Sequence, residues 1–269
     1  MGWAAAFGAL AGAMAVYPEA AAEAARLGLS LWARSVAPVL GPFMVCMLMA
    51  SSRMGGGLWP RVLMGWLTGS PGGAKLTLAA GPRGRSALRC AALTGTMSPL
   101  FFLGTVGTWL GSEKMGGMIL LCHWLGALMI GLCVRADMRL CAPASPMLLS
   151  DALRESAVAL AAVALCMMLG CAAARMAESA LPFLSPAAAA ALQCALEVTS
   201  GVKALIALQS PLTAPLVCAA CSFGGLSLLT QNAAFWQAAG VGMGQLLILR
   251  LFHGALSFAL CFLLTQMIH

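Results

Sequence analysis

Three basic side chains occupy places where an apolar chain rarely carries a charge. Lys75 and Lys203 follow interruptions of two long apolar segments, and Arg250 lies inside a third. A charge at the bilayer centre costs roughly 2.5–3.5 kcal/mol on insertion scales, so such residues usually serve a function. Desolvated carboxylates need cationic or N–H partners, each charge-assisted bond contributing about 1.5–3 kcal/mol. The three cations therefore predict a site for a small organic anion. The alternative is that each lysine reaches an interface or pairs with a carboxylate.

Two further residues are candidates for carrying a coupling proton. Glu197 is an acid well inside an apolar segment, where it could pair with Lys203, Lys75 or Arg250 or take up a proton. His253 follows Arg250 by three residues and shares its helix face, so it could relay protons. The alternative for Arg250 and His253 is that both hydrogen-bond to broken backbone and stabilise the fold. For His123, which has no neighbouring arginine, a structural role is favoured.

Glycine, serine and threonine residues surround the interruptions. Glycine permits local unwinding and Pro99 removes a helix donor, so backbone groups become free to bind a substrate or a sodium ion. The alternative is close helix packing through small residues. The predicted binding set comprises Ser70, Gly72, Gly73, Lys75, Thr94, Thr96, Ser98, Thr199, Ser200, Lys203, Ser222, Gly224 and Arg250.

The composition places these residues in a lipid-embedded chain. Of 269 residues, 61% are hydrophobic and 9% charged, against about 25% charged in soluble domains. The mean hydropathy is +0.93. Too little polar surface remains to cover a water-facing globule, so we expect an all-α polytopic membrane protein.

Charge and cysteine content exclude other classes. The net charge of +7 is spread between apolar segments and comes with a single tyrosine, which favours a positive-inside bias over nucleic-acid binding. Most of the eleven cysteines lie in apolar runs and are expected to be small buried hydrophobes. No reactive constellation of an enzyme is present, and we predict no cofactor and no metal site.

The apolar segments predict about seven spanning helices and two re-entrant hairpins. A span needs about 20 apolar residues. The expected spans are 2–17, 36–52, 90–110, 117–134, 157–177, 211–234 and 240–265, with an amphipathic surface helix over 18–34. Segments 58–82 and 183–209 are interrupted near their middles, and broken backbone at membrane depth must line a cavity or be buried in protein. The arginine-rich loops and the N-terminus are then expected in the cytoplasm.

An internal repeat relates the two halves. An offset of 128 residues aligns Gly73-Ala-Lys75 with Gly201-Val-Lys203 and lays 94–99 over 222–227; two inserted residues then bring His123 onto His253. With opposite orientations, this is the inverted-repeat plan of secondary transporters. We divide the chain into 1–35 (N-terminal helices), 36–134 (first repeat), 135–156 (cytoplasmic linker) and 157–269 (second, inverted repeat).

Several motifs resemble the sporulation integral membrane protein YlbJ family, which carries the nucleoside-recognition (Gate) domain. They are Gly69-Ser-Pro-Gly-Gly-Ala-Lys75, Thr94-Gly-Thr-Met-Ser-Pro99, the segment from Leu31-Trp32 to Pro42-Phe43, and Arg250-Leu-Phe-His253. The resemblance implies dipicolinate transport from mother cell to forespore and similarity to concentrative nucleoside transporters. The chain departs from the family pattern at Ser70, Gly95 and Ser98.

The first functional hypothesis is a secondary carrier of a small organic anion, with dipicolinate as substrate and H⁺ or Na⁺ as coupling ion. The second is a nucleoside or cation carrier on the same architecture. The third is a non-transporting membrane scaffold for spore-envelope assembly. Expected partners are the small solute, the lipid bilayer and a second copy of the chain, with no nucleic acid.

Overall fold

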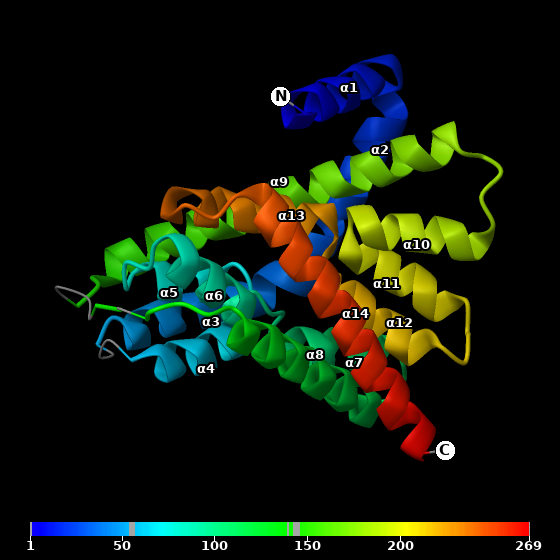
Figure 1. Ribbon diagram of the computed structural model, residues 1–269. Helices are drawn as coiled ribbons and strands as arrows, with labels where there is room; N and C mark the ends of the chain where they lie inside the picture. The colour runs from blue at the N-terminus through cyan, green and yellow to red at the C-terminus, as the bar shows by residue number, and fades with distance from the viewer. Residues whose placement is uncertain (1, 54–56, 139, 142–145, 269) are drawn as a thin grey trace.

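The computed structural model describes residues 2–53, 57–138, 140–141 and 146–268, and these residues form helices joined by turns, with no strand among them (Figure 1). The first half contains α1 Gly2–Val16, α2 Pro18–Leu31, the π-helical turn Trp32–Val36, α3 Ala37–Ser51, α4 Leu58–Thr68, α5 Gly72–Leu78, α6 Gly84–Thr94, a second π-helical turn Phe101–Val106, α7 Gly107–Trp109 and α8 Glu113–Cys133. The second half contains α9 Leu149–Ala180, α10 Pro186–Leu196, α11 Val198–Ala207, α12 Thr213–Phe223, α13 Gly225–Trp236, the 3-10 turn Gln237–Ala239 and α14 Met243–Ile268.

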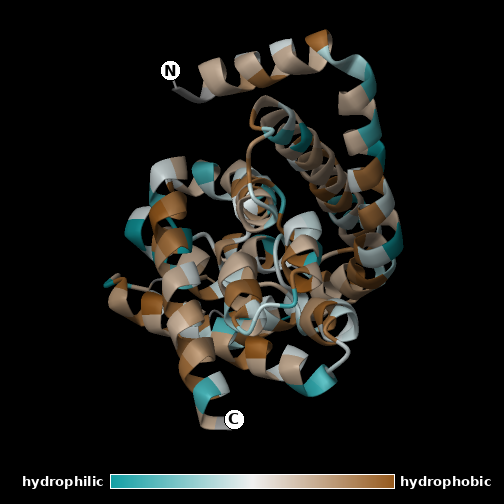
Figure 2. Ribbon diagram, turned by 90° about the vertical axis from the view of Figure 1, so that its right-hand side faces the viewer, coloured by the Kyte–Doolittle hydropathy of each residue, from teal (hydrophilic) through white to brown (hydrophobic). Residues whose placement is uncertain are grey.

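Five helical stretches in the described residues are long and apolar enough to cross a membrane. They are Pro18–Ser51, Glu113–Cys133, Leu149–Ala180, Thr213–Ala239 and Met243–Met267. Side chains on their outer faces are hydrophobic and exposed, such as Phe252 and Leu263 on α14, at 65% and 60%. Figure 2 shows hydrophobic residues along most of the helices. A surface of this kind requires lipid around it.

The expected number of seven spans therefore differs from the five found. Segment 2–17 forms α1, whose 15 residues fall short of the ~20 that a span needs. Segment 90–110 is divided, because α6 ends at Thr94 and helix resumes only at Pro99. The expected surface helix 18–34 runs without interruption into α3, because a π-helical turn at 32–36 continues the helix into the next apolar stretch.

Each interrupted apolar segment forms a pair of short helices. Helices α4 and α5 contact each other, as do α10 and α11. In Figure 1 the α10–α11 pair extends inward from the end of the molecule where α9 finishes, and α4–α5 lies toward the opposite end. Both pairs turn within the body of the protein, at Gly69-Ser70-Pro71 and at Glu197.

The bounds of these helices follow the repeat. Helix α4 covers residues 58–68, and the 128-residue offset carries these bounds onto 186–196, the bounds of α10. The same offset carries α6, residues 84–94, to within one residue of α12, residues 213–223. In both halves a broken span follows the hairpin, and a long helix, α8 or α14, follows the broken span. The two halves thus have the same order of elements.

Candidate functional site

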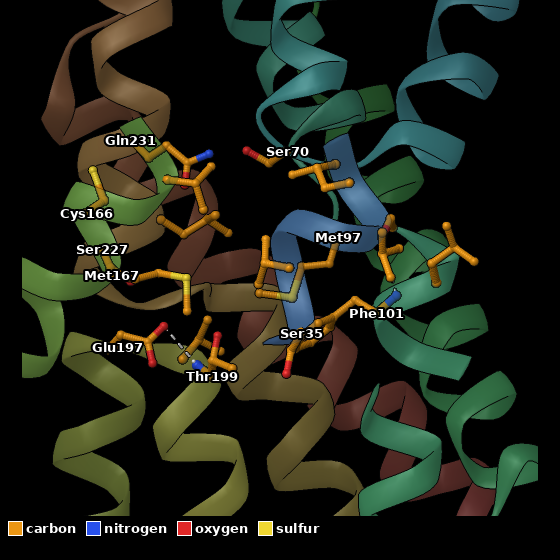
Figure 3. A pocket seen from close by; sticks show the side chains of 18 of the residues that line it. Ser35, Ser70, Met97, Phe101, Cys166, Met167, Glu197, Thr199, Ser227 and Gln231 are labelled. Carbon is orange, nitrogen blue, oxygen red and sulfur yellow. Dashed lines mark hydrogen bonds between the residues drawn. The ribbon is translucent and has the colours of Figure 1, made fainter. Parts of the chain in front are cut away.

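A cavity of about 90 Å³ lies where the two hairpin turns meet the two broken spans. Figure 3 shows Ser70 of the first hairpin, Glu197 and Thr199 of the second, Met97 of the first broken span and Gln231 of the second around one space. Helices α3 and α9 close its remaining sides, with Val39 and Met167 among their contributions. We call this space the central pocket.

The turn of the first hairpin is fixed against both broken spans. Gly69 has φ +70°, a conformation that favours glycine, and ends α4. The backbone N–H of Ser70 donates to the carbonyl of Thr96 at 2.7 Å, and its hydroxyl donates to the side-chain oxygen of Asn232 at 3.0 Å. Ser70 therefore connects α13 with the unwound stretch after α6, and it lines the central pocket.

The turn of the second hairpin is capped by its own carboxylate. Glu197 accepts hydrogen bonds from the backbone N–H of Thr199 at 3.1 Å and of Ser200 at 2.7 Å. It is 1% exposed and lines the central pocket together with Thr199. A negative charge here also complements the positive end of the α11 dipole. Burial of Glu197 is therefore offset by these local hydrogen bonds, and no basic partner is found for it among the described residues.

The broken spans present polar groups at the pocket. Gly224 and Gly225 have φ +85° and +70°, so they separate α12 from α13 with a bend that other residues rarely adopt. Beyond the bend, the side-chain nitrogen of Gln231 is buried and has no hydrogen-bond partner among the described residues. The same holds for the hydroxyl of Thr96. An unsatisfied buried donor costs about 1–3 kcal/mol, so a ligand that accepts from Gln231 would recover this energy.

A second polar cluster fastens the broken spans to α8 and α14. His123 Nε2 accepts from the backbone N–H of Met97 at 3.0 Å, so Nδ1 carries the proton shared with the Ser222 hydroxyl at 2.8 Å. His253 Nε2 lies 2.8 Å from the His123 carbonyl. The Arg250 guanidinium donates to the carbonyl of Gly95.

This second cluster is packed rather than hollow. The ring centres of His123 and His253 lie 4.7 Å apart, and Arg250 is only 6% exposed. The side-chain hydrogen bonds of His123 and Arg250 named above all go to ends of the broken helices. The arrangement suits a structural clamp, and none of these three residues lines the central pocket.

The structure does not bring the three predicted cations together. Lys75 forms an ion pair with Glu155 of α9, and its ammonium lies 5.4 Å from the Phe235 ring centre. Lys203 is exposed on α11. None of the described residues that line the central pocket is basic.

The remaining members of the predicted set divide between pocket and packing. Ser70, Ser98 and Thr199 line the central pocket. Ser200 lines a separate hollow between α2, α9 and α10. Thr94, Gly72, Gly73, Ser222 and Gly224 are buried at helix contacts and helix ends.

The predicted set lacks several residues that line the pocket: Ser35, Met97, Cys166, Ser227 and Gln231. Gln231 was detectable from the sequence, because the polar run Thr230-Gln-Asn232 interrupts an apolar span. Ser35 and Cys166 lie on unbroken helices, and their sequence surroundings carry no comparable signal.

Comparison with known proteins places these features in context. No protein-family model matches the chain, and no solved structure matches it. Among curated proteins, the chain is similar to the sporulation integral membrane protein YlbJ of Bacillus subtilis (strain 168), with 29% identity over 147 residues. The match covers 45% of this chain and 35% of that protein. The chain is thus a multi-pass, all-helical membrane protein that resembles a sporulation membrane protein.

Proposed function

We propose that this protein is a secondary membrane carrier that binds a small polar solute in the central pocket. The observation that supports this most directly is the convergence of two hairpin turns and two broken spans on one largely apolar space that Ser70, Glu197 and Gln231 line with polar groups. Polar, non-helical backbone inside an apolar bundle is costly unless it lines a cavity or a route for a solute. In the proposal both hairpins re-enter the membrane, and the halves form an inverted repeat.

The chemistry of the pocket favours a neutral, hydrogen-bonding solute. Glu197 and the hydroxyls of Ser70 and Thr199 can accept from donors of a solute, and the free N–H of Gln231 can donate to an acceptor. A nucleoside offers both kinds of group together with an apolar face for Met97 and Phe101. Under this proposal the solute and lipid are the partners, and the protein is a carrier rather than an enzyme.

Dipicolinate is the second candidate, and the resemblance to YlbJ favours it. A dianion beside an ionised Glu197 would be repelled, because the described lining residues provide no cation. Protonation of Glu197 would remove this repulsion and would free the N–H groups of Thr199 and Ser200 for a carboxylate. Dipicolinate transport would then be coupled to a proton, in a membrane of the sporulating cell.

Flux into proteoliposomes can test the proposal and separate the two substrates. Labelled uridine and labelled dipicolinate are each offered to the wild type, Gln231→Leu and Glu197→Gln. Gln231→Leu should reduce flux of the true substrate at least tenfold, because the leucine cannot donate a hydrogen bond. Gln237→Leu, a matched change at an exposed residue of the adjoining turn, should leave flux unchanged.

The Glu197→Gln variant distinguishes the substrates. The variant should weaken binding of a nucleoside that donates to the carboxylate. Transport of a dianion, in contrast, should no longer depend on proton uptake. If neither solute is transported by the wild type, the substrate assignment fails. If Gln231→Leu transports as well as the wild type, the central pocket is not the binding site.

A further inference from the structure

A second hollow, of about 630 Å³, lies beside the first hairpin and is much larger than the central pocket. Lys75 and Leu76 of α5, Leu48 and Ser51 of α3, Glu155 of α9 and Phe235 of α13 are among its lining residues. We call this hollow the vestibule. Pockets for drug-sized ligands are roughly 300–1,000 Å³, so the vestibule can admit a nucleoside-sized solute, whereas the central pocket is closed in this structure and must widen to bind one.

The same helices line the vestibule and the central pocket in succession. Along α3, Leu40 lines the central pocket and Leu48 lines the vestibule. Along α9, Val163 lines the central pocket and Glu155 lines the vestibule. These residues lie eight positions apart, which is two helical turns on one face. The two spaces therefore follow one another along a common set of helix faces.

Between the two spaces lies a small apolar cluster. On α3, Met44 is four residues from both Leu40 and Leu48; on α9, Ala159 stands midway between Glu155 and Val163. Met44 and Ala159 are fully buried and belong to one packed cluster with Leu76 of the hairpin, which is 1% exposed. We call Met44, Leu76 and Ala159 the plug. Because the side chains of all three plug residues are apolar and buried, the plug bars a polar solute.

On the vestibule side of the plug, the Arg61 guanidinium donates to the Leu76 carbonyl at 3.0 Å, and the Lys75 ammonium joins the hairpin to α9. Lys75 donates to the carboxylate of Glu155, and also to the Glu155 backbone carbonyl at 3.0 Å. It neighbours Leu76 of the plug, and its contacts join the first hairpin to α9. Breaking this ion pair would release the hairpin from α9 at the place where the plug closes.

We propose that the vestibule is the entrance to the central pocket, with the plug as its closed gate and the Lys75–Glu155 ion pair as the latch. The inference rests on the proposed carrier function and adds a route and a gate to it. It also gives Lys75 a role that direct contact with substrate in the central pocket does not require. The arginine-rich loops place the vestibule at the cytoplasmic face in this proposal.

A native cysteine reports on the gate. Cys166 lines the central pocket, so its rate of modification measures access to that space. An impermeant thiosulfonate reagent is applied to inside-out membrane vesicles, and modification of Cys166 is quantified by peptide mass spectrometry. Cys218, which is fully buried in the core, serves as the internal control for unfolding. No cysteine needs to be replaced.

Opening the latch should accelerate modification of Cys166 about tenfold. Lys75→Met and Glu155→Gln should both show this acceleration, and the charge swap Lys75→Glu with Glu155→Lys should return the rate toward the wild-type value. Arg154→Gln, a change at an exposed neighbour of Glu155, should have no effect. Met44→Ala, which shortens a plug residue and leaves the latch intact, should also accelerate modification of Cys166. This variant tests the gate even if a latch variant does not fold.

An unchanged Cys166 rate in folded variants, or acceleration only when the reagent is applied to the opposite face, would overturn the gate. Protection of Cys166 by uridine or dipicolinate tests the carrier proposal separately. If neither solute protects Cys166 but its modification depends on the latch, the substrate assignment is refuted and the route through the vestibule stands. If a solute protects Cys166 but its modification does not depend on the latch, the substrate assignment stands and the gate is refuted.

Discussion

Replacing His123 by phenylalanine should destabilise the protein, because one imidazole satisfies groups of both broken spans. The ring accepts from Met97 N–H and bonds the Ser222 hydroxyl, and it is fully buried. Phenylalanine keeps a similar ring beside Phe102, whose centre lies 4.9 Å away, but it leaves both partners unpaired. Each unsatisfied buried group costs about 1–3 kcal/mol. Because the serine hydroxyl can rotate toward other acceptors, we take the total as about 3 kcal/mol.

Thermal unfolding in detergent measures this effect. At roughly 2–4 °C per kcal/mol for a chain of this size, His123→Phe should lower the Tm by about 6–12 °C. Ser222→Ala removes one bond and should lower it less. In the double variant, loss of the hydroxyl removes an unpaired group, so the combined effect should be smaller than the sum. A Tm for His123→Phe within about 1 °C of the wild type would refute the assignment of His123 as a clamp, given the at least ~1 kcal/mol expected.

Three further predictions follow from the packing around the pocket. Gly73→Ala should prevent correct folding, because its Cβ would lie 2.8 Å from the Thr94 carbonyl oxygen and 3.1 Å from Gly65 Cα; loss of the monodisperse peak in size-exclusion chromatography checks this. Glu197→Ala should cost about 1 kcal/mol through loss of the α11 cap, measured as a fall in Tm, whereas Glu197→Gln should retain part of the cap. Gly225→Ala should lower the Tm by several degrees, because a φ of +70° disfavours a side chain, and an unchanged Tm would contradict the described bend.

The elements of the fold were largely predictable because glycine and proline interrupt apolar runs at few places. Gly69-Ser-Pro71 and the Glu197 region mark turns within segments too apolar for loops, and the structure has helix breaks at both. The same reasoning predicted a broken span over 90–110, and the structure has the break between Thr94 and Pro99. Pro99 follows a non-helical stretch from Gly95 to Ser98. The backbone groups of this stretch bond to His123, Arg250 and Ser70 rather than to a helical neighbour.

The composition of the pocket was less predictable, because it depends on partners distant in sequence. Lys75 and Glu155 are 80 residues apart, and no sequence feature near Lys75 indicates that this carboxylate is its partner. Arg250 meets a carbonyl 155 residues earlier in the chain. Rotation of a helix about its axis decides whether a charge faces a cavity, a carbonyl or the surface, and packing of other elements sets that rotation. Glu197 was identifiable, because its partners Thr199 and Ser200 lie within the next three residues of the sequence.

The unbroken helix from Pro18 to Ser51 has a consequence for how the protein sits in its bilayer. At 1.5 Å per residue, its 34 residues extend for about 51 Å, whereas the hydrocarbon layer is about 30 Å thick. Fitting that length between the headgroups would take a tilt steeper than the 0–40° of known spans, so one end must project. Helix α2 packs along α9, which is itself overlong at 32 residues. On α2 the side chains of Glu19, Glu23 and Arg26 are exposed, so we expect the Pro18 end of this long helix to be the end that lies beyond the hydrocarbon layer.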